Sequence, residues 1–283
     1  MPCRLLIALM LATAFTGIAA QAAEPVRLRA SKPVLAHPHD MVLSQDGTLL
    51  YVADQNNHAI TVLDANMLAV KGTIGKGELS RPHDVAWDKK GRLLVADTGN
   101  DRIAFYIVRG STGRYFGQIK DTLESTEGVT VGPRGNIYAT SVRNQAVVEF
   151  QGGDLVGLST WDAPRSLRLS LPHDIAFAPD GRLWVADSGN DRIVIIDPAG
   201  YKLIRILDKK TYGFSGVRYF AFDRAGRAYL ADKYANRVVI LDKSLKIAKV
   251  IPNLNNPEGV VTRGKRFWIA ETYANRVLLY EWK

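Results

Sequence analysis

The phrase Tyr51-Val-Ala-Asp54 returns as Leu94-Val-Ala-Asp97, Trp184-Val-Ala-Asp187, Tyr229-Leu-Ala-Asp232 and Trp268-Ile-Ala-Glu271, with a weaker copy at Tyr138-Ala-Thr140. Its alanine falls at positions 53, 96, 139, 186, 231 and 270, so successive copies lie 39 to 47 residues apart. A second phrase follows several copies, as in Asn100-Asp-Arg102-Ile and Asn190-Asp-Arg192-Ile. Self-similarity at such a period is typical of repeat architectures.

Each copy of the phrase lies in a unit that is expected to hold four short β-strands. In the second unit these are residues 84–88, 92–96, 102–108 and 114–119. The segments are rich in Val, Ile and aromatic residues, which favours strands over helices. The first turn of every unit holds a glycine, where a positive φ is tolerated: Gly47, Gly91, Gly135, Gly181, Gly226 and Gly264. Six such units predict an all-β fold, a six-bladed β-propeller of four-stranded blades.

The two ends of the repeat region complement each other. The sixth unit stops at Trp282-Lys283 after three expected strands, while a strand-like stretch from Val26 to Lys32 precedes the first unit. We expect this N-terminal strand to complete the last blade, which closes the ring and removes its open edge. The propeller domain would then span residues 24–283.

Residues 1–23 are interpreted as a signal peptide. Arg4 supplies the positive charge, Leu5 to Ile18 the short apolar stretch, and Ala20-Gln21-Ala22 a small-x-small cleavage site. The alternative is a membrane anchor, although the stretch is shorter than the roughly 20 apolar residues that cross a bilayer. Cleavage implies a periplasmic or secreted protein with no membrane span. We expect it to be a monomer without a nucleic-acid partner.

Composition excludes several classes of protein. Apolar residues make up 47% and charged residues 23% of the 283 residues, as in ordinary globular proteins. The single cysteine, Cys3, excludes a disulfide scaffold, an iron–sulfur cluster and a cysteine-based zinc site. No phosphate-binding loop, serine nucleophile elbow or His-Glu-x-x-His motif is present.

The Asp, Asn and Arg that recur after the repeated phrase are interpreted as structural. Asp97 and Asn100 suit a tight turn, because their side chains bond to nearby main-chain amides. Arg102 can pair with Asp97. Residues that recur in nearly every blade are typical of a role in folding and packing, whereas catalytic residues occur once.

The innermost strands should all begin at one end of the channel, which we call the mouth. Their second residues are His39, His83, Glu127, His173, Arg218 and Glu258, and their third residues are Asp40, Asp84, Gly128, Asp174, Tyr219 and Gly259. Three of the five histidines in the chain therefore occupy equivalent positions.

Three imidazoles near carboxylates suit a divalent metal ion. His39, His83 and His173 would bind Zn²⁺ or another first-row ion and leave a position for water or substrate. The aspartates that follow them could orient these ligands. The alternative is that Pro-His-Asp only begins each strand, with the His filling a gap near the axis and the Asp accepting main-chain N–H groups.

The motifs of the chain resemble those of the NHL-repeat family. Pro82-His83-Asp84-Val-Ala, Gly91 to Asp97 and Asn100-Asp-Arg102-Ile match its pattern, as does the stretch from Pro172 to Ile193. The resemblance covers essentially all of residues 24–283. It implies a propeller, a fold that hosts both binding proteins and enzymes.

The mouth also resembles that of peptidylamidoglycolate lyases, NHL-type propellers whose central zinc is held by three such histidines. The resemblance implies that His39, His83 and His173 are metal ligands. The Arg and Tyr that these lyases use at the mouth have candidates in Arg218, Tyr219, Tyr234 and Tyr273.

Streptogramin B lyases and gluconolactonases are similar propellers that use His and Glu, or mainly Glu, Asp and Asn, around a divalent cation. The likeness implies that His173 with Glu127 or Glu258 could form such a site. The sequence does not identify a cofactor, and a divalent metal ion at the mouth, Zn²⁺ or Ca²⁺, is the candidate.

Two functions stay open at this point. The first is a binding module whose mouth contacts a protein, a cell-envelope component or a small anionic ligand. The net charge is +9, and a basic rim of Arg165, Arg168, Lys209 and Lys210 is expected in the longer loops over the mouth.

The second function is a metal-dependent lyase or hydrolase, with Glu127, Arg218 and Tyr219 as catalytic candidates. The further ligand-binding candidates are Asp40, Asp84, Asp174, Glu258, Tyr234, Tyr273, Arg165 and Arg168.

Overall fold

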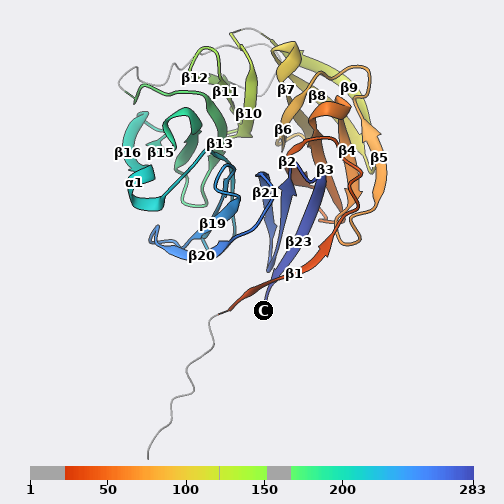
Figure 1. Cartoon of the computed structure of the whole chain (residues 1–283). Helices are drawn as coiled ribbons and strands as arrows, with labels where there is room; N and C mark the ends of the chain where they lie inside the picture. The colour runs from red at the N-terminus through yellow and green to blue at the C-terminus, as the bar shows by residue number, and fades with distance from the viewer. Residues whose placement is uncertain (1–22, 121, 152–166) are drawn as a thin grey trace, which may run out of the picture.

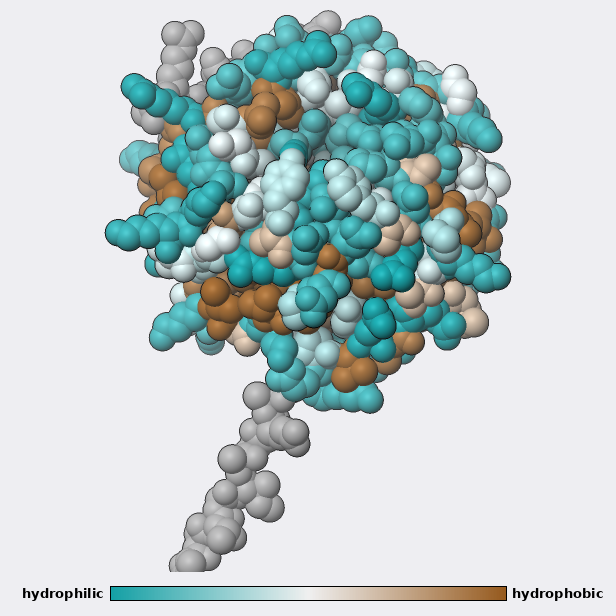
Figure 2. Space-filling model, in the orientation of Figure 1, coloured by the Kyte–Doolittle hydropathy of each residue, from teal (hydrophilic) through white to brown (hydrophobic). Residues whose placement is uncertain are grey.

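A computed structural model describes residues 23–120, 122–151 and 167–283. Six antiparallel sheets stand around a common axis as a β-propeller, which confirms the predicted fold (Figure 1). The expected signal peptide lies outside the described residues apart from Ala23. Within the described residues, no helix is both long and apolar enough to cross a bilayer. One face of the disc is covered mostly by hydrophilic residues, with separate hydrophobic patches (Figure 2).

The strands run outward from the axis in each blade. The first blade holds β2 (Pro38–Leu43), β3 (Leu49–Asp54), β4 (Ala59–Asp64) and β5 (Val70–Ile74). The second holds β6 (Pro82–Trp87), β7 (Arg92–Asp97), β8 (Arg102–Arg109) and β9 (Thr112–Ile119). The third shows β10 (Thr126–Val131), β11 (Ile137–Ser141) and β12 (Ala146–Phe150) within the described residues.

The other three blades each have four strands. The fourth holds β13 (Pro172–Phe177), β14 (Leu183–Asp187), β15 (Arg192–Asp197) and β16 (Lys202–Leu207). The fifth holds β17 (Val217–Phe222), β18 (Ala228–Asp232), β19 (Arg237–Leu241) and β20 (Ile247–Ile251). The sixth holds β21 (Pro257–Arg263), β22 (Arg266–Glu271), β23 (Arg276–Trp282) and β1 (Pro25–Ala30). A one-turn helix, α1 (Lys209–Tyr212), precedes the fifth blade.

The ring closes as predicted. Strand β1 pairs antiparallel with β23, from Pro25 opposite Trp282 to Ala30 opposite Leu278. The last blade is also tied to the first, because the Thr272 hydroxyl donates a hydrogen bond of 2.8 Å to the carbonyl of Pro38. Closure removes the unpaired sheet edge that an open array would expose.

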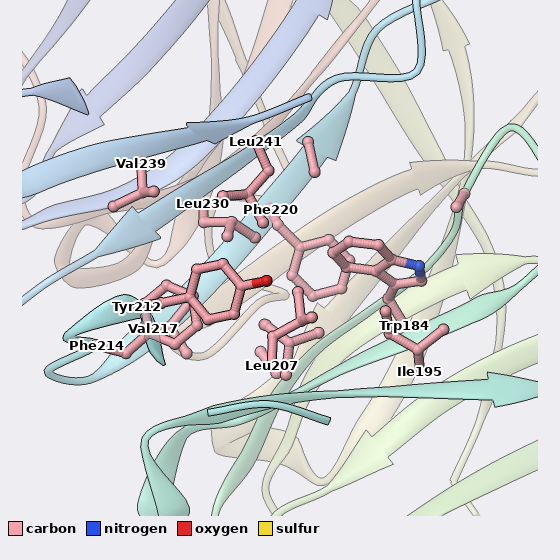
Figure 3. Packing of buried hydrophobic residues seen from close by; sticks show 14 residues of the cluster. Trp184, Ile195, Leu207, Tyr212, Phe214, Val217, Phe220, Leu230, Val239 and Leu241 are labelled. Carbon is pink, nitrogen blue, oxygen red and sulfur yellow. The ribbon is translucent and has the colours of Figure 1, made fainter. Parts of the chain in front are cut away.

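Apolar side chains pack between neighbouring blades and form the core. Between the fourth and fifth blades, the ring of Trp184 lies 5.9 Å from that of Phe220, centroid to centroid, and Leu230 and Leu241 pack in the same cluster (Figure 3). The ring of Phe222 lies 4.9 Å from that of Trp184. Each blade therefore buries its faces only against its two neighbours, which gives the fold its repeated, ring-shaped core.

The repeated Asp, Asn and Arg form a latch at the end of the second strand of a blade. Asp97 is completely buried and accepts hydrogen bonds from the Ser80 amide at 2.6 Å, Asn100 Nδ2 at 2.8 Å and Arg102 Nε at 2.6 Å. In the third blade Ser141 occupies the Asp position and accepts from the Glu124 amide at 2.9 Å. The latch therefore fastens the loop that enters each blade to the strand beside it.

Every innermost strand carries a β-bulge near its start. In β13, Pro172 pairs with Asp187 and Ile175 pairs with Val185, so two residues oppose the single residue Ala186. A bulge of this kind re-aims side chains that would otherwise alternate between two faces. As a result, the consecutive His173 and Asp174 both reach neighbouring innermost strands.

Candidate functional site

The side chains at the second positions of the innermost strands meet at the mouth. The rings of His39 and His83 have centroids 4.3 Å apart, and Nε2 of His83 lies 3.9 Å from Oε1 of Glu127. The other oxygen of Glu127 lies 2.8 Å from Nε2 of His173. The hydroxyl of Tyr219 lies 3.4 Å from the main-chain carbonyl of Glu127. Residues far apart in sequence thus form one continuous polar cluster.

Glu127 is held ionised at the centre of this cluster. Burial works to raise the pKa of its carboxyl, but the neighbouring histidines and Arg218 outweigh burial and bring the pKa to about 2. A carboxylate with so low a pKa keeps its negative charge at every physiological pH.

His83 is neutral and fixed in one tautomer. Its Nδ1 donates to the carbonyl of Arg81 at 2.9 Å, and its Nε2 accepts from the side-chain amide of Gln55 at 2.9 Å. Burial, assisted by the nearby His39, lowers the pKa of His83 to about 3. The lone pair on Nε2 is therefore engaged by the Gln55 amide.

His173 is anchored in the same way but has a different partner. Its Nδ1 lies 2.7 Å from the carbonyl of Leu171, two residues earlier in the chain, and its Nε2 faces Glu127. A carbonyl and a carboxylate are both hydrogen-bond acceptors, so each ring nitrogen of His173 faces an acceptor.

A second imidazole–carboxylate pair lies across the mouth. Nδ1 of His39 is 2.6 Å from Oε2 of Glu258, whose other oxygen contacts the ammonium group of Lys233. Burial works to raise the pKa of Glu258, but His39 and Lys233 hold it well below its usual value. Nε2 of His39 lies 3.2 Å from Nδ1 of His37. Lys233 therefore neutralises a carboxylate that is almost wholly buried.

Arg218 and Tyr219 follow each other at the start of β17 and differ in environment. Tyr219 is completely buried, and burial together with the two glutamates raises the pKa of its hydroxyl well above the usual value. Arg218 donates from Nη2 to the hydroxyl of Tyr234 at 3.0 Å. Within the described residues, its Nε has no hydrogen-bond partner and no carboxylate lies within 4 Å of the guanidinium.

Two exposed tyrosines flank Lys233 at the entrance to this cluster. Tyr234 and Tyr273 are 56% and 58% exposed, and their ring centroids lie 5.7 Å and 5.9 Å from the Lys233 ammonium nitrogen. Their faces are therefore accessible to a molecule that approaches the mouth.

Two of the three aspartates at the third positions accept hydrogen bonds from main-chain amides of the next blade. Asp84 accepts from the Val129 amide at 2.6 Å, and Asp174 accepts from the Phe220 amide at 2.9 Å, in each case from the next blade. Burial raises the pKa of Asp84 to about 6. Asp40 and Asp174 are raised well above the usual value by burial and by the neighbouring aspartates. A direct role for these residues in ligand binding stays a prediction.

The mouth carries side chains of the types that bind divalent metal ions, but among the described residues they are not arranged around one position. His83 and His173 each hold Nδ1 on a main-chain carbonyl, which is how metal-binding histidines are usually oriented, and each directs Nε2 toward Glu127. In the described ranges, no group of three or more His, Cys, Asp or Glu side chains is spaced to hold one ion as it stands. Binding would therefore require Glu127 to change its contacts.

The expected basic rim is only partly visible. Arg165 lies outside the described residues, and Arg168 is exposed at the mouth end. In α1, Nζ of Lys209 lies 2.7 Å from Oδ2 of Asp191. Acidic side chains at this end thus offset part of the positive charge that the sequence predicts for the rim.

The sequence analysis missed Lys233, Gln55 and His37. Lys233 and Gln55 each come directly after the Asp of the repeated phrase, and each reaches the second residue of the next innermost strand. In the second, fourth and sixth blades a Thr or Ser at this position bonds instead to a carbonyl, as Thr98 does with Thr126. In the third blade the position holds Val142. A comparison of this column across the six units would have singled out the two long polar side chains.

A model of the NHL repeat matches residues 79–104 and 169–196. These two stretches are NHL repeats, which supports the resemblance of this part of the propeller to the NHL-repeat family. These two matches fall on the second and fourth blades, whose Pro-His-Asp and Asn-Asp-Arg motifs are the most complete.

Curated relatives of this NHL-repeat propeller are much longer proteins. Peptidyl-glycine alpha-amidating monooxygenase A of Xenopus laevis is 29% identical over 135 residues, which is 44% of this chain and 14% of the relative. Protein SUPPRESSOR OF QUENCHING 1, chloroplastic, of Arabidopsis thaliana is 27% identical over 179 residues, which is 58% of this chain and 16% of the relative. The chain thus matches about a sixth of their length or less.

Solved structures similar to the NHL-repeat propeller include enzymes. A gluconolactonase from Xanthomonas campestris gives a TM-score of 0.72 at 16% identity, covering 92% of this chain and 90% of its own. Virginiamycin B lyase from Staphylococcus aureus gives 0.66 at 13% identity, covering 92% and 98%. At these identities the likeness establishes the fold alone.

Proposed function

We propose that the mouth binds a small polar substrate and acts on it by acid–base chemistry, as a lyase or hydrolase. The observation that carries this proposal is a pair of imidazole–carboxylate contacts, His173 with Glu127 and His39 with Glu258, in one buried cluster. Carboxylates that orient imidazoles recur in catalytic sites, because they fix the ring and stabilise its protonated form. Structural packing alone does not require such a concentration of buried charge.

The geometry suggests a division of roles. His173, with acceptors on both nitrogens, is suited to donate a proton to a leaving group. Glu127 has too low a pKa to remove a proton efficiently near neutral pH, so we assign it to holding His173. Arg218 has an unpartnered Nε for an anionic group of the substrate, and Tyr219 offers a neutral hydroxyl as a hydrogen-bond donor.

A divalent ion such as Zn²⁺ extends this proposal. His39, His83 and His173 would hold it together with Glu127, and it would supply a Lewis acid that polarises a substrate oxygen. The resemblance of the mouth to peptidylamidoglycolate lyases supports this set of ligands. The predicted signal peptide supports a periplasmic or secreted site for this activity.

A binding module is the second candidate function. Tyr234 and Tyr273 are exposed aromatic side chains beside the mouth, and such residues often anchor partners. On this alternative, a protein or cell-envelope component docks over the mouth, and the buried cluster serves only to hold the blades together.

Turnover assays separate these candidates. Substrates to test are sugar lactones and cyclic depsipeptides, which the names of the gluconolactonase and lyase neighbours suggest, together with peptides ending in α-hydroxyglycine. Activity that falls at least about a hundredfold in His173→Asn and Glu127→Gln would support the enzyme. Glu281→Gln, which alters a glutamate away from the cluster, should keep full activity.

Metal analysis tests the extended proposal. One equivalent of bound metal that is lost in the folded triple variant His39→Ala, His83→Ala and His173→Ala would support it. Full activity of metal-free protein would contradict it. The binding module would be favoured if none of these substrates is turned over. Ligand affinity should then be unchanged in the histidine variants and reduced when Tyr234 or Tyr273 is replaced.

A further inference from the structure

The face opposite the mouth, which we call the far face, concentrates positive charge. It is formed by the turns after the first and third strands of each blade, since Trp87 pairs with Leu93 and Arg92 with Ile107 at that end. The turns that follow the innermost strands carry exposed Lys89, Arg134, Arg224, Arg263 and Lys265. Within the described residues, none of these five has a carboxylate within 4 Å.

Carboxylates in the same turns are already engaged. Asp88 accepts from the amides of Lys90 and Arg92 and from Nε of Arg92 at 2.6 Å. Asp223 binds Arg227 in the same manner, with Nε at 2.6 Å. The acidic groups therefore shape their own turns, and the charge of the neighbouring cations faces solvent.

The turns between the third and fourth strands add to this charge. They carry further exposed basic residues: Arg109, Arg114, Lys202, Lys243 and Lys246. Cations thus lie on both the inner and the outer circle of turns, which spreads the charge over the whole face instead of along one groove.

Large apolar side chains are exposed at the same end. Met67 lies in the turn after β4 and is 58% exposed, while Val70, Leu203 and Ile247 stand at the starts of outer strands and are 47% to 48% exposed. Register places these three level with the far ends of the innermost strands. Cations beside apolar side chains suit a surface that offers both phosphate groups and acyl chains.

The chain also enters the propeller at this face. Pro25, the first residue of β1, pairs with Trp282, whose amide bonds to the carbonyl of Lys265 in a far-face turn. Strand β1 therefore begins on the far face.

We propose that the far face docks the propeller on an anionic lipid membrane, independently of the chemistry at the mouth. Each basic residue near an anionic surface is attracted to it, and the attraction fades over a Debye length, so salt should weaken the binding. A nucleic acid would use the cations but not the apolar side chains, so the two partners are distinguishable. The mouth would then face away from the bilayer and stay open to substrate.

The test uses residues 23–283, which retain every described strand, and vesicles of phosphatidylcholine with or without about one third phosphatidylglycerol. Binding to the anionic vesicles, weakened by salt, is the expected result. The triple variant Arg134→Glu, Arg224→Glu and Lys265→Glu should lose roughly tenfold or more in vesicle affinity. Lys120→Glu, Arg143→Glu and Lys210→Glu together change the net charge equally on the mouth face and should bind like the parent.

Two further measurements keep the result decisive. Met67→Ser with Leu203→Ser should weaken vesicle binding and leave binding to duplex DNA unchanged. Should the glutamate variant fail to fold, the same three positions changed to Gln give the comparison with a smaller charge change. The proposal would be overturned if the protein does not bind anionic vesicles or if both charge variants lose the same vesicle affinity. It would also be overturned if the far face binds duplex DNA more tightly than it binds the vesicles.

Discussion

Nε2 of His173 lies 2.8 Å from Oε2 of Glu127, although the two residues come from different blades and are 46 positions apart in the chain. The contact exists because β10 and β13 are neighbouring innermost strands and because a bulge turns His173 toward the axis. Because such a contact depends on the charge of Glu127, the free energy of unfolding should vary with pH.

We expect the protein to lose stability in acid. The folded-state pKa of Glu127 is about 2 and that of His83 is about 3, both below their usual values of 4.5 and 6.5. Each group contributes fully to the free energy of unfolding when the pH is above its pKa in the unfolded chain. The contribution of His83 is lost as the pH falls from 6.5 to about 3, and that of Glu127 as the pH falls from 4.5 to about 2. Asp84, with its pKa raised to about 6, acts in the opposite direction between pH 6 and 3.8.

Urea unfolding between pH 7 and pH 3 measures this balance. In Glu127→Gln the loss below pH 4.5 should be smaller by up to about 3 kcal/mol, which is the scale that a shift of this size implies. Glu281→Gln, which alters a surface carboxylate on the far face, serves as the control. A pH profile of Glu127→Gln that matches the parent would show that the contact does not contribute to folding.

Removal of the N-terminal strand should open the ring. A chain that begins at Lys32 lacks β1 and leaves the edge of β23 unpaired, so we expect it to aggregate or to unfold at a clearly lower urea concentration. A chain that begins at Pro25 keeps the pairing and should unfold like the parent. Urea titration with light scattering checks both, and equal midpoints would contradict the closure.

Addition of one methyl group at Gly259 should disturb the mouth. A Cβ there would stand 2.3 Å from the carbonyl oxygen of His39, which is main chain and cannot move freely. Gly259→Ala is therefore expected to cost about 1–3 kcal/mol and to displace His39 from Glu258. Gly200→Ala, where the nearest atom is a flexible lysine carbon at 3.6 Å, is the matched control. Thermal unfolding of both variants gives the answer, and equal stability would refute the steric argument.

Loss of the latch in one blade should lower the free energy of unfolding without removing a catalytic group. Asp97→Ala leaves Arg102 and the Ser80 amide without their buried acceptor, and we expect a loss of about 3–5 kcal/mol. Asp180→Ala, at an exposed ion pair with Arg182, should change stability by less than about 1 kcal/mol. Circular dichroism melts measure both. An Asp97→Ala variant that folds normally and lacks activity would show that the residue is catalytic.

The fold could be predicted from the sequence because each feature that determines it lies within one repeat or between neighbouring repeats. The spacing of the repeated phrase, the turn glycines and the strand-like stretch at Val26 to Lys32 each act on their own unit or on its neighbour. The observed pairing of β1 with β23 follows from that pattern alone. Even the equivalent positions of His39, His83 and His173 could be read from the register of the repeats.

Only the tertiary structure decided which side chains contact one another at the mouth. The bulge at each innermost strand allows consecutive residues such as His173 and Asp174 to reach different neighbours, which a simple alternating strand would forbid. Lys233 and Gln55 join the site from second-strand turns, a placement that depends on how adjacent blades are rotated about the axis. The pairing of buried charges is non-local, because it depends on distances between blades, and no short stretch of sequence records such distances.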